Sequence, residues 1–181
     1  MRNQKGFTLI ELIIVIVVLG ILAVTAAPQF INFSSDARAS ALKGMEGSIK
    51  GATQLTYSKA AVEGKESAAS GESISVKGNT VDLVYGYPAA SGTGIINAVD
   101  GSFDTNLSAD WVYEEGTQDD GSGGTEPSGE IFIAQSSSVT GSGSGGDYAS
   151  GDIASSNCYL TYKVASSSEP ATVAVSEDSG C

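Results

Sequence analysis

The feature that most constrains this chain is a largely apolar run of 21 residues near its start, from Phe7 to Ala27. As an α-helix, this run would measure about 32 Å, roughly the thickness of the hydrocarbon core of a bilayer. Its single charged residue is Glu11. A charge inside a bilayer costs about 3 kcal/mol on insertion scales. We therefore expect a group from outside this chain to compensate Glu11.

Two ordinary explanations of the run account for only part of it. A secretory signal peptide cut near Ala27 fits the basic residues Arg2 and Lys5. However, the run is longer than a usual signal core, and Pro28 lies where the cut would fall. A plain membrane anchor, with Arg2 and Lys5 in the cytoplasm, fits the length of the run but leaves Glu11 unexplained.

A third explanation is a resemblance that rests on the segment KGFTLIE, residues 5–11. This segment resembles the processing site of type IV prepilins, in which a peptidase cuts after a glycine and the new N-terminal phenylalanine is methylated. The resemblance implies cleavage between Gly6 and Phe7, N-methylation of Phe7, and an assembly role for Glu11. It divides the N-terminal part into a leader (1–6) and a hydrophobic transmembrane and filament-core segment (7–27).

Elementary electrostatics supports this interpretation of Glu11. Cleavage after Gly6 would leave a cationic amine at Phe7, one helical turn before Glu11. In a dry bundle of such helices, the carboxylate of one subunit can pair with the amine of its neighbour, and a paired charge is tolerated where a lone one is not. We expect this pairing to fix the register between subunits.

Two residues in or beside the apolar run are poor helix formers. Pro28 cannot donate a backbone hydrogen bond and crowds the preceding turn, and Gly20 has low helix propensity. Assembled pili of the resembled family have a loosened helix in this region, which implies a helix break between Gly20 and Pro28 in the filament. A simple kink at Pro28 in the isolated subunit is the alternative.

After Pro28 the pattern becomes amphipathic, and residues 28–64 are predicted to continue the helix. Apolar residues recur at helical spacing, and the helix is expected to reach about Ala61 and to end at Gly64. The predicted buried stripe consists of Ala41, Leu42, Met45, Ile49, Ala52 and Leu55.

Residues 65–181 are predicted to form a globular head of short strands and loops. Alternating apolar residues flank a turn at Gly78-Asn79, which predicts a hairpin that includes Tyr85 and ends at Pro88. A short helical turn is expected at 94–99. A small aromatic segment at 111–113 is expected to serve packing. Further strands are expected at 131–134, 158–164 and 171–175, with loops at 116–129 and 136–152.

The two cysteines, Cys158 and Cys181, suggest one disulfide in an exported domain, because their number is even and they follow a membrane-length segment. Two unrelated buried thiols are the alternative. The expected fold class is α+β, the type IV pilin fold: a long N-terminal helix on a C-terminal antiparallel sheet with a disulfide-bounded tail loop. The YGYP segment at 85–88, the strand at Cys158-Tyr159 and Cys181 resemble mannose-sensitive hemagglutinin pilins.

Composition excludes several functions. The chain has no histidine, and its net charge is −12. We therefore expect no enzyme activity, no cofactor and no metal site. Residues 78–181 contain 15 acidic residues and one lysine, which argues against nucleic acid as a partner.

The resemblance implies a major structural subunit of a type IV pilus that polymerises as a helical filament and mediates surface or cell attachment. Its implied partners are other copies of itself, the prepilin peptidase, the pilus assembly machinery and, before assembly, the inner membrane of a Gram-negative cell. A minor pilin or type II secretion pseudopilin would share this N-terminus. A non-polymerising membrane-anchored binding module is the alternative of another class.

Overall fold

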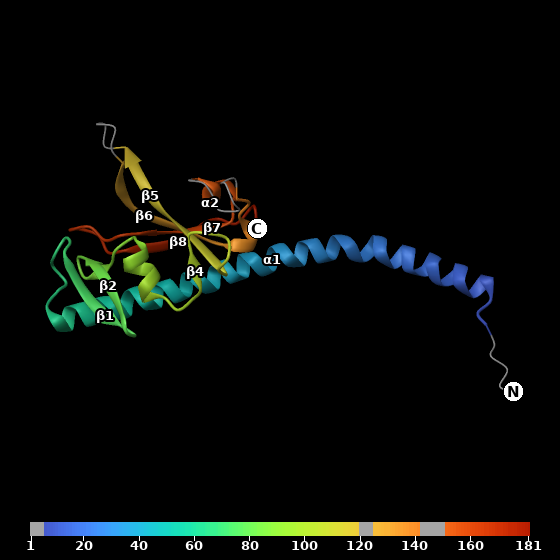
Figure 1. The fold of residues 1–181 in the computed structure, drawn as a ribbon, viewed down its shortest axis with the longest axis horizontal. Helices are drawn as coiled ribbons and strands as arrows, with labels where there is room; N and C mark the ends of the chain where they lie inside the picture. Colours follow the sequence, from blue (N-terminus) through green and yellow to red (C-terminus); the bar gives the residue numbers. More distant parts are fainter. Residues whose placement is uncertain (1–5, 120–124, 142–150) are drawn as a thin grey trace. The chain divides into compact units, whose positions relative to one another are not determined.

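The computed structural model describes residues 6–119, 125–141 and 151–181. Within these ranges, only the backbone is described for residues 26–32, 117–119 and 125–128. The chain divides into two compact units, Met1–Ala37 and Arg38–Cys181, and helix α1 contributes residues to both (Figure 1).

Helix α1 spans Leu9–Glu63. It ends at Gly64, where φ is +71° and the chain adopts the left-handed conformation that glycine tolerates best. The Lys65 N–H donates to the Ala60 carbonyl at 2.9 Å, and the Gly64 N–H donates to the Ala61 carbonyl at 3.3 Å. This pair of hydrogen bonds is a Schellman motif, so the predicted role of Gly64 is confirmed.

One face of α1 is buried in the second unit, as the predicted amphipathic stripe requires. Leu42 and Ile49 are fully buried and Met45 is nearly so. Leu55 was predicted wrongly, because it is 56% exposed. The buried face continues instead through Thr53, Thr56 and Ala60, whose spacing from Ile49 follows 3.6 residues per turn. Apolarity alone had favoured Leu55 over the two threonines.

The first sheet has three strands in the order β1-β2-β3: β1 Glu72–Val76, β2 Asn79–Val84 and β3 Tyr87–Pro88. Val76 pairs with Asn79, so the turn residues are Lys77 and Gly78, one position earlier than predicted. Both have positive φ, as a type I′ hairpin turn requires. The hairpin is confirmed, but Tyr85 lies outside β2 in the next turn.

The predicted short helical turn is present as the π-helix η1, Gly92–Ile96. The Gly94 N–H donates to the Ser91 hydroxyl at 3.0 Å, which caps the start of η1.

The second sheet has the order β4-β5-β6-β7-β8. Its strands are β4 Phe103–Asp104, β5 Trp111–Asp119, β6 Thr125–Gln135, β7 Tyr159–Lys163 and β8 Thr172–Glu177. Neighbouring strands pair antiparallel, except for the two-residue parallel pairing of β4 with β5. The head therefore holds two sheets, where the sequence had predicted one.

The predicted loops are shorter than expected. Strands β5 and β6 extend through 116–119 and 125–129, with a register shift between Glu115 and Thr117. The predicted loop at 136–152 contains the 3₁₀-helix η2, Ser136–Ser138, and the start of α2, Asp152–Ser155. Residues 120–124 and 142–150 of these loops lie outside the described residues.

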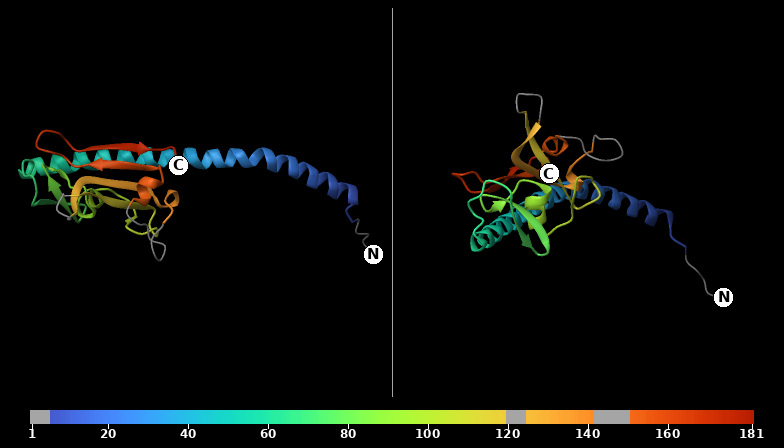
Figure 2. Two further views of the ribbon diagram at one scale, coloured as in Figure 1. Left: turned by 90° about the horizontal axis from the view of Figure 1, so that it is seen from above. Right: turned by 60° about the vertical axis from the view of Figure 1, so that its left-hand side comes forward.

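The main core of the second unit joins α1 to both sheets (Figure 2). Leu42 and Ile49 of α1 pack in one cluster with Val81 and Leu83 of β2, and the other sheet contributes a further set of buried side chains. That set is Ile131, Ile133, Leu160, Tyr162 and Val173. The architecture is thus a long N-terminal helix packed on antiparallel sheets.

Candidate functional site

The residues predicted for processing and assembly lie at the start of α1, in the first unit. Gly6, Phe7 and Thr8 precede the helix, and the Phe7 side chain is 94% exposed. The peptide bond between Gly6 and Phe7 therefore lies in non-helical chain, next to a side chain that packs against little of its own molecule. The processing role of these two residues stays a prediction.

Glu11 has a partner within its own chain. The Thr8 N–H and the Thr8 hydroxyl each donate to Glu11 Oε2 at 2.7 Å. The Glu11 N–H in turn donates to the Thr8 hydroxyl oxygen at 3.4 Å. This reciprocal pair is a capping box, in which two side chains satisfy N–H groups that the first turn of a helix leaves without partners.

This contact revises the sequence view of Glu11 as a carboxylate with no partner in its own chain. The signal was available, because Thr8-x-x-Glu11 before an apolar run is the capping-box pattern. The apolar surroundings of Glu11 obscure this local pattern. Both Thr8 donors use Oε2, and a carboxylate has a second oxygen that can accept further hydrogen bonds.

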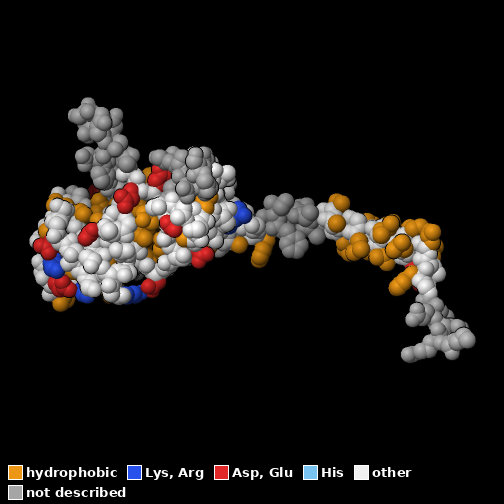
Figure 3. Space-filling view, viewed as in Figure 1, with side chains coloured by type: hydrophobic (Ala, Val, Ile, Leu, Met, Phe, Trp, Pro, Cys, Tyr) orange, Lys and Arg blue, Asp and Glu red, His pale blue; other side chains and the backbone are white. Residues whose placement is uncertain are grey.

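The segment after Glu11 exposes its apolar side chains, and Figure 3 shows them gathered on the visible face of the helix. Every residue from Gly6 to Thr25 is exposed. An exposed apolar surface this continuous marks a membrane or protein contact. Its large members after Glu11 are 45–76% exposed: Leu12, Ile13, Ile14, Val15, Ile16, Val17, Val18, Leu19, Ile21, Leu22 and Val24.

Within the described part of the chain, no helix meets the length and hydropathy needed to cross a membrane. Ala26 and Ala27, the last residues of the predicted membrane-length segment, are among those whose side chains are not described.

Helix α1 includes both predicted break positions, Gly20 and Pro28. A Cβ at Gly20 would meet no atom within 4 Å, so close packing inside this chain does not explain the glycine. The Thr25 hydroxyl donates to the Leu22 carbonyl at 3.0 Å, an internal bond that competes with the helix ladder. The break concerns the assembled filament and stays a prediction.

The predicted disulfide is confirmed. Cys158 and Cys181 are bonded, their Cα atoms lie 4.9 Å apart, and they are separated by 23 residues. Cys158 is fully buried and Cys181 is 7% exposed. The hairpin of β7 and β8 explains the bond, because its register brings the residues before β7 next to those after β8.

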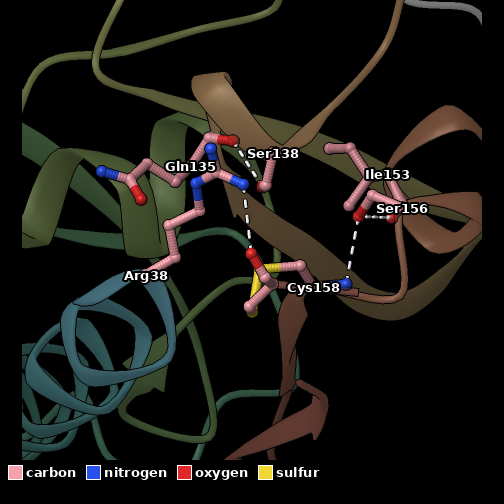
Figure 4. Close-up of a disulfide and its surroundings, with 7 residues drawn as sticks. Arg38, Gln135, Ser138, Ile153, Ser156 and Cys158 are labelled. Atoms are coloured by element: carbon pink, nitrogen blue, oxygen red, sulfur yellow. Dashed lines mark hydrogen bonds between the residues drawn. A yellow bond between two sulfur atoms is a disulfide. The ribbon is translucent and has the colours of Figure 1, made fainter. Parts of the chain in front are cut away.

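The loop that the disulfide closes is also held at Cys181 by hydrogen bonds (Figure 4). Arg38 of α1 donates from Nη1 to the Cys181 carbonyl at 3.1 Å. The Gly180 N–H donates to the Asn157 carbonyl at 2.8 Å. A Cβ at Gly180 would lie 2.0 Å from the Ser156 carbonyl oxygen, so this position accepts only glycine without movement. Sequence reasoning missed Arg38, because the contact joins residues 143 positions apart and no local pattern indicates it.

In the described ranges, no group of three or more His, Cys, Asp or Glu side chains is arranged to hold a metal ion.

The chain is similar to a family model and to several known proteins. Residues 1–27 match the family model described as the prokaryotic N-terminal methylation motif. The chain is 40% identical over 95 residues to the fimbrial protein EcpC of Eikenella corrodens, covering 52% of this chain and 61% of that protein. The chain is thus similar to a fimbrial protein and carries an N-terminal methylation motif.

Two further relatives are a major fimbrial protein and a major pilin by name. The type IV major fimbrial protein FimA of Dichelobacter nodosus is 40% identical over 63 residues, 35% of this chain and 38% of its own. The type IV major alpha-pilin of Moraxella bovis is 41% identical over 76 residues, 41% of this chain and 48% of its own. The chain thus spans less than two thirds of each of these relatives. No solved structure matches significantly. The relatives are structural proteins by name, in agreement with the expectation of no enzyme activity.

Proposed function

We propose that this chain is a major structural subunit of a type IV pilus, which polymerises through its apolar helix and mediates attachment to surfaces or cells. The observation that carries the proposal is the apolar surface from Leu9 to Val24, which is exposed among the described residues of its own unit. Burial of such a surface between copies of the helix would supply the hydrophobic free energy of assembly.

The proposed assembly site pairs Glu11 of one subunit with the amine of Phe7 of another. Cleavage between Gly6 and Phe7 would create that amine, and methylation would leave it cationic. The capping box is compatible with this pairing, because Thr8 donates to one carboxylate oxygen and the second can accept from the neighbouring amine. Capping would also hold Glu11 in a defined rotamer before docking.

The proposed route begins with a precursor pool in the inner membrane, where the prepilin peptidase processes the chain. The pilus assembly machinery would then extract each subunit into a helical filament outside a Gram-negative cell. The relatives are named as fimbrial proteins and major pilins, and these names support this location and this form of assembly. Loosening of α1 between Gly20 and Pro28 belongs to the same proposal.

The finer assignment to the mannose-sensitive hemagglutinin pilins rests on the resemblance of residues 85–88, Cys158-Tyr159 and Cys181. Agglutination of red cells by purified fibres, and its loss on addition of mannose, tests that assignment. Agglutination that mannose leaves unchanged would contradict it.

Fibres sheared from cells, examined by electron microscopy and mass spectrometry, test the main proposal. We expect filaments whose dominant subunit begins at N-methylated Phe7. A scarce subunit within such fibres would indicate a minor pilin, and its presence only in secretion structures would indicate a pseudopilin. A monomer that still begins at Met1 would indicate a non-polymerising anchored binding module.

Three variants separate the charge of Glu11 from its capping role. Glu11→Gln keeps an acceptor suited to a capping box but removes the charge, whereas Glu11→Ala removes both. Either variant would leave the cationic amine of Phe7 buried without a partner. Because an unpaired buried charge is strongly destabilising, we expect either variant to lower fibre yield at least about tenfold. Thr8→Ala removes the cap but keeps the charge, and it should still assemble. Normal fibre yield from Glu11→Gln would overturn the proposed charge pairing.

A further inference from the structure

A groove lies in the second unit, between the C-terminal part of α1, the β2–β3 turn and the β7–β8 loop. Its volume is about 420 Å³, which is in the range of small-molecule sites. Three tyrosines line it, Tyr57, Tyr85 and Tyr87, together with the carboxylates of Glu66 and Glu169. Nothing in the proposed assembly mechanism uses these side chains.

The aromatic wall of the groove is preorganised. The rings of Tyr57 and Tyr87 stack with centroids 4.5 Å apart and an interplanar angle of 23°. The two rings therefore form a stacked pair within the lining of the groove. Tyr57 remains 36% exposed despite this stacking.

The third tyrosine is held in a conformation that its residue type disfavours. Tyr85 and Gly86 form the two-residue turn between β2 and β3, and both have positive φ, +50° and +79°. Asparagine is preferred at the first position of such a turn, and a bulky residue there is strained. Strain of this kind is typical of functional positions, and it keeps an aromatic ring at the mouth of the groove.

The β2–β3 turn also packs closely against Glu66 and Tyr57, which line the groove. A Cβ at Gly86 would lie 2.8 Å from Glu66 Cα and 3.1 Å from Tyr57 Cδ2. The Tyr85 N–H donates to the Ala68 carbonyl at 2.7 Å. These contacts hold Glu66 beside the tyrosines.

The charge of the groove is negative. Glu66 and Glu169 are both exposed side chains in its lining, and the lining residues described for it include no lysine or arginine. The adjoining cavity contains Lys50, whose Nζ lies 2.6 Å from Glu46 Oε1 in an ion pair. The ammonium of Lys50 thus has an acidic partner on its own helix.

We propose that this groove binds a small organic cation that carries a quaternary ammonium group. The faces of tyrosine rings attract such cations, and aromatic walls that recognise them are a recurrent arrangement. The two carboxylates add an attraction that depends on salt. Serine hydroxyls of the β7–β8 loop, at 166–168, can bind a polar tail of the ligand.

Titration of the full-length protein with choline chloride, followed by saturation-transfer NMR of the ligand methyl protons, tests the proposal. The matched neutral probe is 3,3-dimethyl-1-butanol, which has the shape of choline without its charge. We expect the neutral probe to bind at least about threefold more weakly, because it lacks the cation–π attraction. Equal binding of the two probes would overturn the proposal.

Variants at the turn test the site with little risk to folding. Tyr85→Asn removes the ring and places a preferred residue in the turn, so it should fold at least as well and bind choline at least about threefold more weakly. Tyr85→Phe keeps the ring and should bind normally, and Glu66→Gln should weaken binding mainly at low salt. Wild-type affinity in Tyr85→Asn would refute the site.

Glycerophosphocholine distinguishes the two sources of such a cation. Binding as tight as that of choline would indicate the headgroup of a choline lipid, and binding of choline alone would indicate a free solute. None of these results depends on fibre formation, so failure of this proposal leaves the proposed function untouched.

Discussion

The two units of this chain use the same aliphatic residue types in opposite ways. In the first unit, Leu19 and Ile16 are each 58% exposed, whereas in the second Leu160 and Ile133 are completely buried. Residue type therefore does not decide burial. What differs is the pattern, because the first unit is apolar on all faces of its helix and the second alternates apolar with polar positions.

This contrast implies that the two units have different roles. The second unit, with its core and its disulfide, contains what it needs for its own stability. The first unit leaves its apolar surface for other molecules. Changes in the second unit should therefore alter its own unfolding, and we expect them to leave the apolar segment of α1 unaffected.

The largest stability effect should come from the disulfide. Replacement of both Cys158 and Cys181 by serine should lower the free energy of unfolding of the second unit by about 3 kcal/mol, because the denatured chain loses a constraint. Urea unfolding, monitored through the lone tryptophan at position 111, would measure this effect. If hydrogen exchange of residues 9–25 rises as much as that of the sheets, the proposed independence of the units is wrong.

The next effect should come from the tail at Gly180. Gly180→Ala places a Cβ 2.0 Å from the Ser156 carbonyl oxygen. Overpacking of this kind should destabilise the second unit by about 2 kcal/mol. Thermal unfolding of the variant beside the wild type measures the effect, and an unchanged midpoint would show that the tail moves aside freely.

Tyr162 offers a smaller effect that depends on pH. Its hydroxyl donates to the Pro88 carbonyl at 2.6 Å and links the two sheets. Loss of this buried bond in Tyr162→Phe should cost about 1–2 kcal/mol at neutral pH. Burial raises the pKa of Tyr162 well above its usual value.

The raised pKa of Tyr162 determines how its contribution to stability changes with pH. Because the raised pKa favours the neutral phenol in the folded chain, its contribution to stability is complete below the unfolded pKa of about 10. It is lost as the pH rises from there toward the folded pKa. Urea midpoints of the wild type and Tyr162→Phe should therefore converge above about pH 10, and a constant gap would contradict this account.

The smallest expected effect is a gain in stability, whereas the variants above lose stability. Gly44 lies within α1, and a Cβ there would meet no atom within 4 Å. Gly44→Ala should raise the stability of the second unit by at most about 1 kcal/mol, because alanine has the higher helix propensity. A loss of stability in the same urea assay would mean that this face of the helix is already packed in the isolated chain.

The sequence by itself determined the features that depend on local chemistry. The apolar run, the helix end at Gly64 and the first hairpin each follow from residue type and spacing along the chain, and the even number of cysteines suggested the Cys158–Cys181 pair. The capping box at Thr8 and Glu11 also belongs to this class, although it was overlooked.

Only the tertiary structure decided which elements meet. It divided the strands into two sheets, chose Thr53 and Thr56 over Leu55 for the buried face, and brought Arg38 to Cys181. It also gathered three tyrosines from separate elements around one groove. The physical reason is that such contacts depend on packing between residues far apart in the chain, which no local period or propensity encodes.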